Sequence, residues 1–284
     1  MRNATDVQLL ERRKVLELKL MGLKKEIPVD PRNLLTSFNE GEDIYFDEPT
    51  HVYTHAKTGK VFKSATTWLK GYEDQFDSDR ISASCSKKWG IPQEDILGMW
   101  ESNGNAASGF GTAIHAVMEH YFTYKTVGKA VQISAGKEKN AALPNHPFLQ
   151  QLIFDLEKVR VDGDAVQEAL VSSSKLGICG LIDDLFIVDR KKKICRIRDY
   201  KITFDILVEK TDLKAPFTYL GGAKLGKNFV QLSFYGYLMS LSGWTIEGVD
   251  IYNWDGEWSV HTLEGPKLMK TMLLVGSELS KKKR

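Results

Sequence analysis

Apolar and polar positions follow two different periods along this chain, and the changes between them mark its elements. Residues 109–124 carry apolar side chains at three- and four-residue spacing, which predicts a helix with one face in the core. Residues 165–172, 177–188 and 194–202 are short apolar runs bounded by turn residues, and they predict three consecutive strands. In the second run both alternating faces are apolar, which is typical of a strand at the centre of a sheet.

The rest of the chain adds elements on both sides of this unit. After it, the pattern predicts a buried helix, two closing strands and a C-terminal helix, over residues 228–241, 245–254, 258–263 and 266–280. Before it, the pattern predicts a charged helix, a β-hairpin that runs into a helix near Thr67, and irregular helical packing, over residues 5–25, 44–67 and 76–105. This order of elements predicts an α/β fold with a mixed central sheet flanked by helices.

We therefore expect four segments along the chain. An N-terminal helix occupies residues 1–30, and an appendage of a hairpin and helices occupies residues 31–105. The α/β core spans residues 106–264, and a C-terminal helix with a basic tail follows at residues 265–284. The 284 residues suffice for one large domain or two small ones.

Composition narrows the classes of function. The chain has 39 basic and 37 acidic side chains, a net charge of +2, so any nucleic-acid binding must come from local patches. No apolar run reaches about 18 residues, and charges interrupt the N-terminal segment, so we expect no membrane span and no secretory signal. Three cysteines without metal-binding spacing are typical of a reduced, cytoplasmic protein.

Candidate chemistry lies in the predicted central strands. Asp183 falls among Leu, Ile and Phe residues, where a carboxylate is costly unless it is paired or bound to a cation. Asp199 and Lys201 end the next strand on one of its faces, with Tyr200 on the other. If the two strands pair as a hairpin, Asp183 and Asp199 converge beside Lys201. Two carboxylates suit Mg²⁺ or Mn²⁺, and the ammonium group can stabilise or activate a water that attacks a phosphate.

These residues resemble a known superfamily. Gly180-x-x-Asp183 followed by Asp199-x-Lys201 is similar to the PD-(D/E)XK nuclease motif. Features before, between and after the core elements resemble its RecB-like exonuclease branch: Gly111-Thr112-x-x-His115-x-x-x-Glu119, Thr203 and Gln231-x-x-x-Tyr235. The hairpin, with FDEPTHVY and then SATT, is similar to the N-terminal region of phage-encoded members. The resemblance covers the chain from about Tyr45 to Trp254 and implies a restriction-endonuclease-like αβββαβ core.

The resemblance implies roles for the central residues. Asp183 and Asp199 would ligate one or two Mg²⁺ or Mn²⁺ ions, helped by the backbone carbonyl of Tyr200. His115 would be a further ligand, as in the RecB-like branch. Lys201 would orient or help to deprotonate the attacking water, or stabilise charge on the phosphate. No iron–sulfur cluster is expected, because the chain has three cysteines and lacks the spacing of the relatives that carry one.

Other positions have less defined roles under the same resemblance. Glu119 would support the metal ligands or the water around the metal, and Glu168 stands where the first strand leaves room for an acidic residue. Asp184 should point to the opposite face and is a poorer candidate. Gln231 and Tyr235 would hold the catalytic lysine or the DNA backbone.

One glycine-rich segment has two interpretations. Residues 221–227 (GGAKLGK) fit the phosphate loop of nucleotide hydrolases, but Asn228 stands where Ser or Thr should ligate Mg²⁺. The preceding residues also make a poor buried strand. A flexible loop whose Lys224 and Lys227 contact the nucleic-acid backbone is the better account.

The resemblance as a whole implies a metal-dependent deoxyribonuclease, an exonuclease that hydrolyses phosphodiester bonds at single-stranded or duplex DNA ends. Its location would be cytoplasmic, in a bacterial host if the protein is phage-encoded. Two alternatives stay open: an endonuclease or RNA-acting nuclease with the same site, and a non-catalytic binding or scaffold protein with structural carboxylates. The N-terminal helix could dock a recombination or replication protein.

Overall fold

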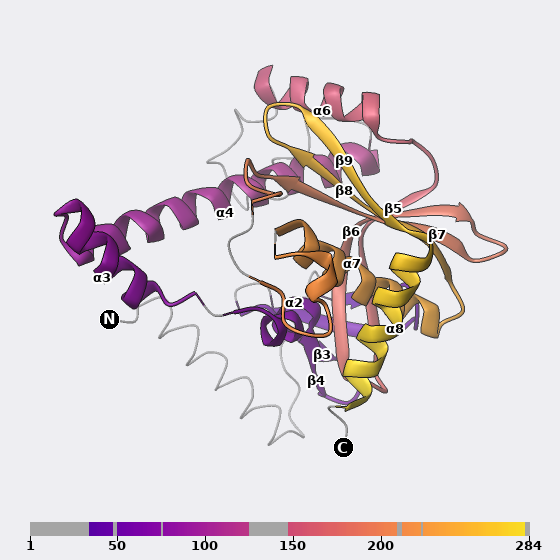
Figure 1. Ribbon diagram of the computed structural model, residues 1–284. Helices are drawn as coiled ribbons and strands as arrows, with labels where there is room; N and C mark the ends of the chain where they lie inside the picture. The colour runs from indigo at the N-terminus through magenta and orange to yellow at the C-terminus, as the bar shows by residue number, and fades with distance from the viewer. Residues whose placement is uncertain are drawn as a thin grey trace.

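The computed structural model describes residues 34–47, 50–74, 76–124, 147–208, 212–222 and 224–281 (Figure 1). The helix predicted over residues 5–25 lies outside these residues. Nine described strands form one mixed sheet in the order β1-β2-β3-β4-β6-β7-β8-β9, with β5 paired to β6 outside this path. They are β1 (Leu34–Thr36), β2 (Asp43–Asp47), β3 (Val52–His55), β4 (Val61–Ser64), β5 (Ala165–Ser173), β6 (Ile178–Asp189), β7 (Ile194–Ile202), β8 (Thr245–Trp254) and β9 (Trp258–Glu264).

Helices cover both faces of this sheet (Figure 1). They are α2 (Ala65–Leu69), α3 (Ser78–Trp89), α4 (Gln93–Tyr124), α6 (Pro147–Val159), α7 (Lys224–Leu241) and α8 (Gly265–Lys281). The largest apolar cluster joins α2, α7 and α8 to one face of the sheet, while a second joins α4 and α6 to Tyr200 and Tyr252. The predicted α/β class, with a mixed sheet flanked by helices, is confirmed.

The N-terminal hairpin shares its sheet with the predicted core. Strand β4 runs parallel to β6, with Lys63 opposite Ile178 and Ser64 opposite Cys179. Strands β7 and β8 are also parallel, and the other strand pairs are antiparallel. Residues of β4 and β7 thus pair with β6 near its two ends. Residues 180–183 of β6, between them, pair with neither strand.

Two helical stretches differ from the sequence prediction. The segment predicted as irregular packing forms α3 and the first part of α4, so the helix expected to begin at residue 109 begins at Gln93. Helix α3 starts where the Asp77 side chain accepts a hydrogen bond from the Arg80 amide, and it ends at Gly90, whose φ is 68°. The exposed part of α4 contains glycines and makes few core contacts. It therefore has no apolar stripe, and its sequence does not show the helical period.

Helix α6 is an element that the sequence analysis missed. Its apolar side chains Leu149, Leu152, Ile153 and Leu156 are buried against α4 and the sheet at helical spacing. The Trp258 indole also donates a hydrogen bond to the Leu152 carbonyl oxygen at 2.9 Å. Among the described residues, no helix is both long enough and apolar enough to cross a membrane.

Candidate metal centre and active site

Three carboxylates lie side by side on three neighbouring strands. Gln167 of β5 and Arg198 of β7 both pair with Asp184 of β6. Extending these antiparallel registers by one residue places Glu168 opposite Asp183, and Asp183 opposite Asp199. We call this set the carboxylate row. Like charges directly opposite one another destabilise a sheet, so the row requires protons or cations to offset its charge.

The backbone changes its side-chain alternation at this row. Val166 and Ala169 of β5 contact the same apolar cluster although they are three residues apart, and so do Ile182 and Leu185 of β6. In a regular strand such residues lie on opposite faces. Glu168 has a φ of 48°, in the left-handed region that side chains other than glycine rarely adopt, and this accounts for the change in β5. Strained backbone of this kind concentrates at functional sites.

His115 reaches the row from α4. Its Nδ1 lies 3.2 Å from Asp183 Oδ2, and its Nε2 lies 2.8 Å from the carbonyl oxygen of Tyr200. The Tyr200 amide in turn donates to Asp183 Oδ2 at 3.2 Å. One ligand atom each from His115, Glu168 and Asp183 lie within 4.8 Å of one another. These three side chains could therefore hold a metal ion.

Lys201 places a cation beside the row. Its Nζ lies 2.5 Å from Asp199 Oδ2 and donates to the Tyr200 carbonyl oxygen at 3.3 Å. Burial lowers the pKa of Lys201, but the charges of Asp199 and Asp183 outweigh it and raise that pKa overall. The ammonium group is therefore charged at neutral pH. Its side chain keeps 29% of its surface exposed, whereas that of Asp199 keeps 6%.

Two acids of the row, Asp199 and Glu168, hold their protons more tightly than free carboxyl groups. Burial raises the pKa of Asp199 to about 6, against the opposing charge of Lys201. Burial and then the charges of Asp183, Glu119 and Asp199 raise the pKa of Glu168 to about 8. Glu119 lies one helical turn after His115, and partial burial raises its own pKa. This crowding of negative charge is what a divalent cation would relieve.

The other face of the sheet anchors the same strands. Asp184 is fully buried there, and Tyr200 Oη donates to its Oδ2 at 2.7 Å. Arg160, which follows α6, donates from Nε to Asp184 Oδ2 and to Tyr200 Oη, each at 2.9 Å. Arg198 Nη1 lies 3.6 Å from Asp184, and Gln167 donates to Asp184 Oδ1 at 3.1 Å. This network fixes Tyr200, whose carbonyl oxygen faces His115 and Lys201. Asp184 points away from the row, as the sequence analysis expected.

Gln231 and Tyr235 of α7 border the row. Gln231 Nε2 donates to Tyr235 Oη at 2.9 Å. Tyr235 is buried, and its pKa is raised by burial and by the charges of Asp183 and Asp199. A Cβ on Gly180 would lie 2.3 Å from the Tyr235 ring, so only glycine fits under this ring. The close contact with the Tyr235 ring therefore explains why the motif Gly180-x-x-Asp183 has a glycine at its first position.

The loop after β7 is held by polar contacts of its own. Thr203 donates from Oγ1 to Asp205 Oδ1 at 2.5 Å, and Lys224 forms an ion pair with the same carboxylate. Lys227 pairs with Glu73 at 2.7 Å. Both lysines thus contact carboxylates in this structure, and contact with a phosphate would require them to exchange these partners. A short 3₁₀ turn (Thr218–Leu220) precedes residues 221–227, where a phosphate loop would follow a strand.

The structure brings most of the predicted site residues together. His115, Glu168, Asp183, Asp199 and Lys201 meet around the Tyr200 carbonyl, with Glu119, Gln231 and Tyr235 next to them. Sequence reasoning missed the anchoring role of Arg160 and the position of Tyr53 close to Glu168. An arginine directly after an amphipathic helical pattern was the available signal for Arg160. The position of Tyr53 depends on the pairing of β4 with β6, which no local pattern shows.

Comparisons with known proteins add little to this geometry. No family model and no curated protein matches the chain. Among solved structures, SSO0001 is similar at 14% identity and a TM-score of 0.25, over 60% of this chain and 73% of that one. A similarity of this size carries no argument about function.

Proposed function

We propose that this protein is a metal-dependent deoxyribonuclease with a restriction-endonuclease-like core of the RecB-like PD-(D/E)XK type. The observation that carries the proposal is the carboxylate row with Lys201 at one end and His115 beside its centre. Acidic residues from consecutive strands, a lysine two residues after the last of them and a preceding helical histidine agree with that motif in residue type and order.

The side chains of the row fit a divalent cation. Asp183, Glu168 and His115 would hold it, with Asp199 and the Tyr200 carbonyl oxygen as further ligands. Carboxylate and carbonyl oxygens suit Mg²⁺ and Mn²⁺. Burial first, and then the neighbouring acids, raise the pKa of Glu168 to about 8, and a cation would offset the negative charge of this carboxyl group when it ionises. A bound ion supplies Lewis-acid stabilisation of the charge that develops on a phosphate under attack.

The chain's own groups perform the remaining tasks. The Lys201 ammonium orients the attacking water and stabilises negative charge on the phosphate, since its raised pKa keeps it protonated. His115 and the network behind Tyr200 hold the Asp183 carboxylate and the Tyr200 carbonyl in place. Gln231 limits the motion of Tyr235 against the row through its hydrogen bond.

Substrate selection at this site would rest on the DNA backbone, since phosphate contacts position a nucleic acid without specifying its sequence. We propose that the enzyme is an exonuclease acting on DNA ends. An endonuclease or an RNA-acting nuclease would use the same residues, and the choice of substrates in the experiment separates these activities.

The experiment compares wild type, Lys201→Ala and the control Lys191→Ala, which changes an exposed lysine in the turn between β6 and β7. The substrates are end-labelled single-stranded DNA, linear duplex, a covalently closed circle and a single-stranded RNA, in Mg²⁺, in Mn²⁺ and in EDTA. We expect metal-dependent loss of linear DNA with the circle spared. Lys201→Ala should slow cleavage by about 10²–10⁴-fold, and Lys191→Ala should cleave like wild type.

Each of the other outcomes would indicate a different function. Cleavage of the closed circle would indicate an endonuclease, and cleavage of RNA alone would indicate a ribonuclease. If wild type leaves every substrate intact in both metals, the carboxylate row is structural and the nuclease proposal fails.

A further inference from the structure

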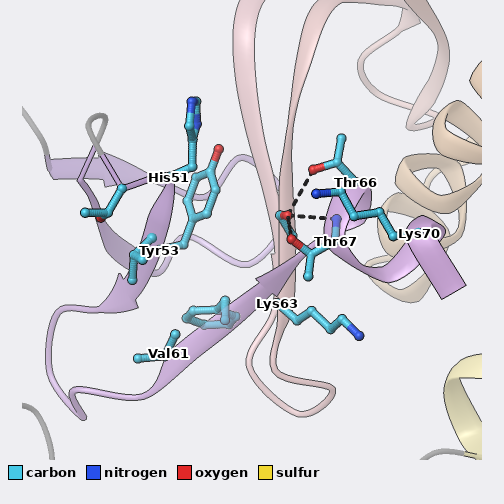
Figure 2. A pocket seen from close by; sticks show the side chains of 11 residues that line it. His51, Tyr53, Val61, Lys63, Thr66, Thr67 and Lys70 are labelled. Atoms are coloured by element: carbon cyan, nitrogen blue, oxygen red, sulfur yellow. Dashed lines mark hydrogen bonds between the residues drawn. The ribbon is translucent and has the colours of Figure 1, made fainter. Parts of the chain in front are cut away.

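A second concave surface lies on the hairpin side of the sheet. It is bounded by β3, β4 and α2 and has a volume of about 620 Å³, within the range of small-ligand sites. We call it the hairpin pocket. Figure 2 shows Thr66 and Thr67 of α2 and Lys70, directly after it, on one side of the pocket and His51 and Tyr53 on the other.

The lining of the hairpin pocket suits an anion. It carries the hydroxyl groups of Ser64, Thr66 and Thr67 and the ammonium groups of Lys63 and Lys70, and no carboxylate is among the described lining residues. Lysine and hydroxyl side chains are standard donors to nucleic-acid phosphates. With a net charge of only +2 on the chain, phosphate binding depends on local groups of donors, and the hairpin pocket holds one such group.

The hydroxyl groups are already held together. Ser64 Oγ donates to Thr67 Oγ1 at 2.9 Å and lies 3.0 Å from Thr66 Oγ1. It also accepts a hydrogen bond from the Thr67 amide at 3.2 Å, which fixes the start of α2 (Figure 2). Little conformational entropy is therefore lost when these donors bind a ligand.

The hairpin pocket is connected to the carboxylate row. Ser64 pairs with Cys179 of β6, four residues before Asp183, a separation of about 13 Å along a strand. Tyr53 lines the pocket and is buried, and the Glu168 charge contributes to its raised pKa. Tyr53 thus lies within electrostatic range of both the pocket and the row.

We propose that the hairpin pocket binds the sugar-phosphate backbone of the DNA strand a short distance from the bond at the carboxylate row. The inference rests on the proposed nuclease function, because it assigns the pocket to the same substrate strand. The ligand class is a phosphodiester-linked nucleotide of a single strand, bound through its phosphate by Thr66, Lys63 and Lys70.

The test measures binding of a fluorescently labelled oligodeoxythymidylate in EDTA, where no cleavage takes place, over a series of salt concentrations. The variants are Lys63→Gln/Lys70→Gln and Thr66→Val. The control Lys191→Gln/Lys267→Gln removes the same charge from exposed positions on the β6–β7 turn and on α8. Wild type and control should share one slope of log affinity against log salt. The pocket double variant should lose about 0.7 from this slope for each of the one or two phosphates that Lys63 and Lys70 contact.

Uncharged linkages in the oligonucleotide then show which of its phosphates contact the hairpin pocket. A single methylphosphonate placed at successive positions of the oligonucleotide should weaken wild-type binding at one or two linkages. The Lys63→Gln/Lys70→Gln variant should be insensitive to the same linkages. Thr66→Val should lower affinity without changing the slope, since it removes a hydrogen bond and no charge.

Two results would overturn the inference: a salt slope in the pocket variant equal to that of wild type, or an equal loss of slope in the control variant. Failure of the proposed function is distinguishable from either result. A wild-type protein that binds the oligonucleotide through these lysines but cuts nothing in Mg²⁺ or Mn²⁺ would contradict the nuclease proposal alone.

Discussion

At the scale of single residues, two consecutive aspartates have neighbours of opposite charge. Asp183 faces the carboxylate row, where its neighbours across the sheet are the acids Glu168 and Asp199. Asp184 faces Arg160, whose Nη2 lies 2.8 Å from its Oδ2, and the side chains of both are almost fully buried. Because successive side chains of a strand point to opposite faces, this segment of β6 contributes to the site on one face and to its support on the other.

This difference predicts opposite effects of the same substitution. Asp184→Asn should lower the free energy of unfolding by about 3–5 kcal/mol, because it leaves two buried guanidinium groups without their carboxylate. In the metal-free protein Asp183→Asn should raise that free energy by up to about 1 kcal/mol, because it removes a negative charge from between two other acidic residues. Urea unfolding in EDTA measures both, and equal destabilisation by the two variants would contradict the account.

At the scale of elements, the approach of α7 to β6 depends on a single glycine. The Tyr235 ring lies directly against Gly180, and Gln231 holds the phenol group on its other side. Helix α7 is buried over most of its length against the same sheet face. The contact therefore sets how close α7 lies to the carboxylate row.

Two glycine-to-alanine substitutions should have effects of opposite sign. Gly180→Ala should destabilise the protein by about 1–3 kcal/mol, since the new methyl group overlaps the buried Tyr235 ring. Gly104→Ala in α4 meets nothing within 4 Å and should stabilise the helix by about 0.5–1 kcal/mol. Thermal unfolding compares the two, and a neutral Gly180→Ala would show that α7 can move away without cost.

The sequence predicts individual elements better than their contacts. Strands β5 to β9 and helices α7 and α8 follow from periodicity, because each buries one or both faces in the main core. The alternation in β7 correctly separates Asp199 and Lys201 from Tyr200, since it depends on neighbouring residues alone. The left-handed backbone at Glu168 and the pairing of β4 with β6 depend on distant partners, so no local pattern shows them.

At the scale of the whole molecule, the raised pKa values of the row make stability depend on pH. The folded state raises the pKa of Glu168 from 4.5 to about 8 and that of Asp199 from 3.8 to about 6. Between these limits the folded protein binds more protons than the unfolded chain, so its stability falls as pH rises.

We therefore expect the Tm of the metal-free protein to fall as pH rises from about 4.5 to about 8. The loss of stability should be on the order of a few kcal/mol. Mg²⁺ or Mn²⁺ should restore Tm most at the upper end, because ionised carboxylates bind the cation. Calorimetry of wild type and Glu168→Gln tests this, and the variant should show a smaller decrease. A Tm that rises with pH in EDTA would contradict the prediction.

The parallel pairing of β4 with β6 also has a consequence for synthesis of the chain. Ser64 and Cys179 are 115 positions apart, so at roughly 5–20 residues per second the edge of β4 waits on the order of ten seconds for its partner. An unpaired strand edge is a template for association with other chains. The residues that would cut DNA also emerge in order, His115 first and Lys201 last. A ribosome that stops before Lys201 therefore releases a fragment without this side chain, which the proposed mechanism needs.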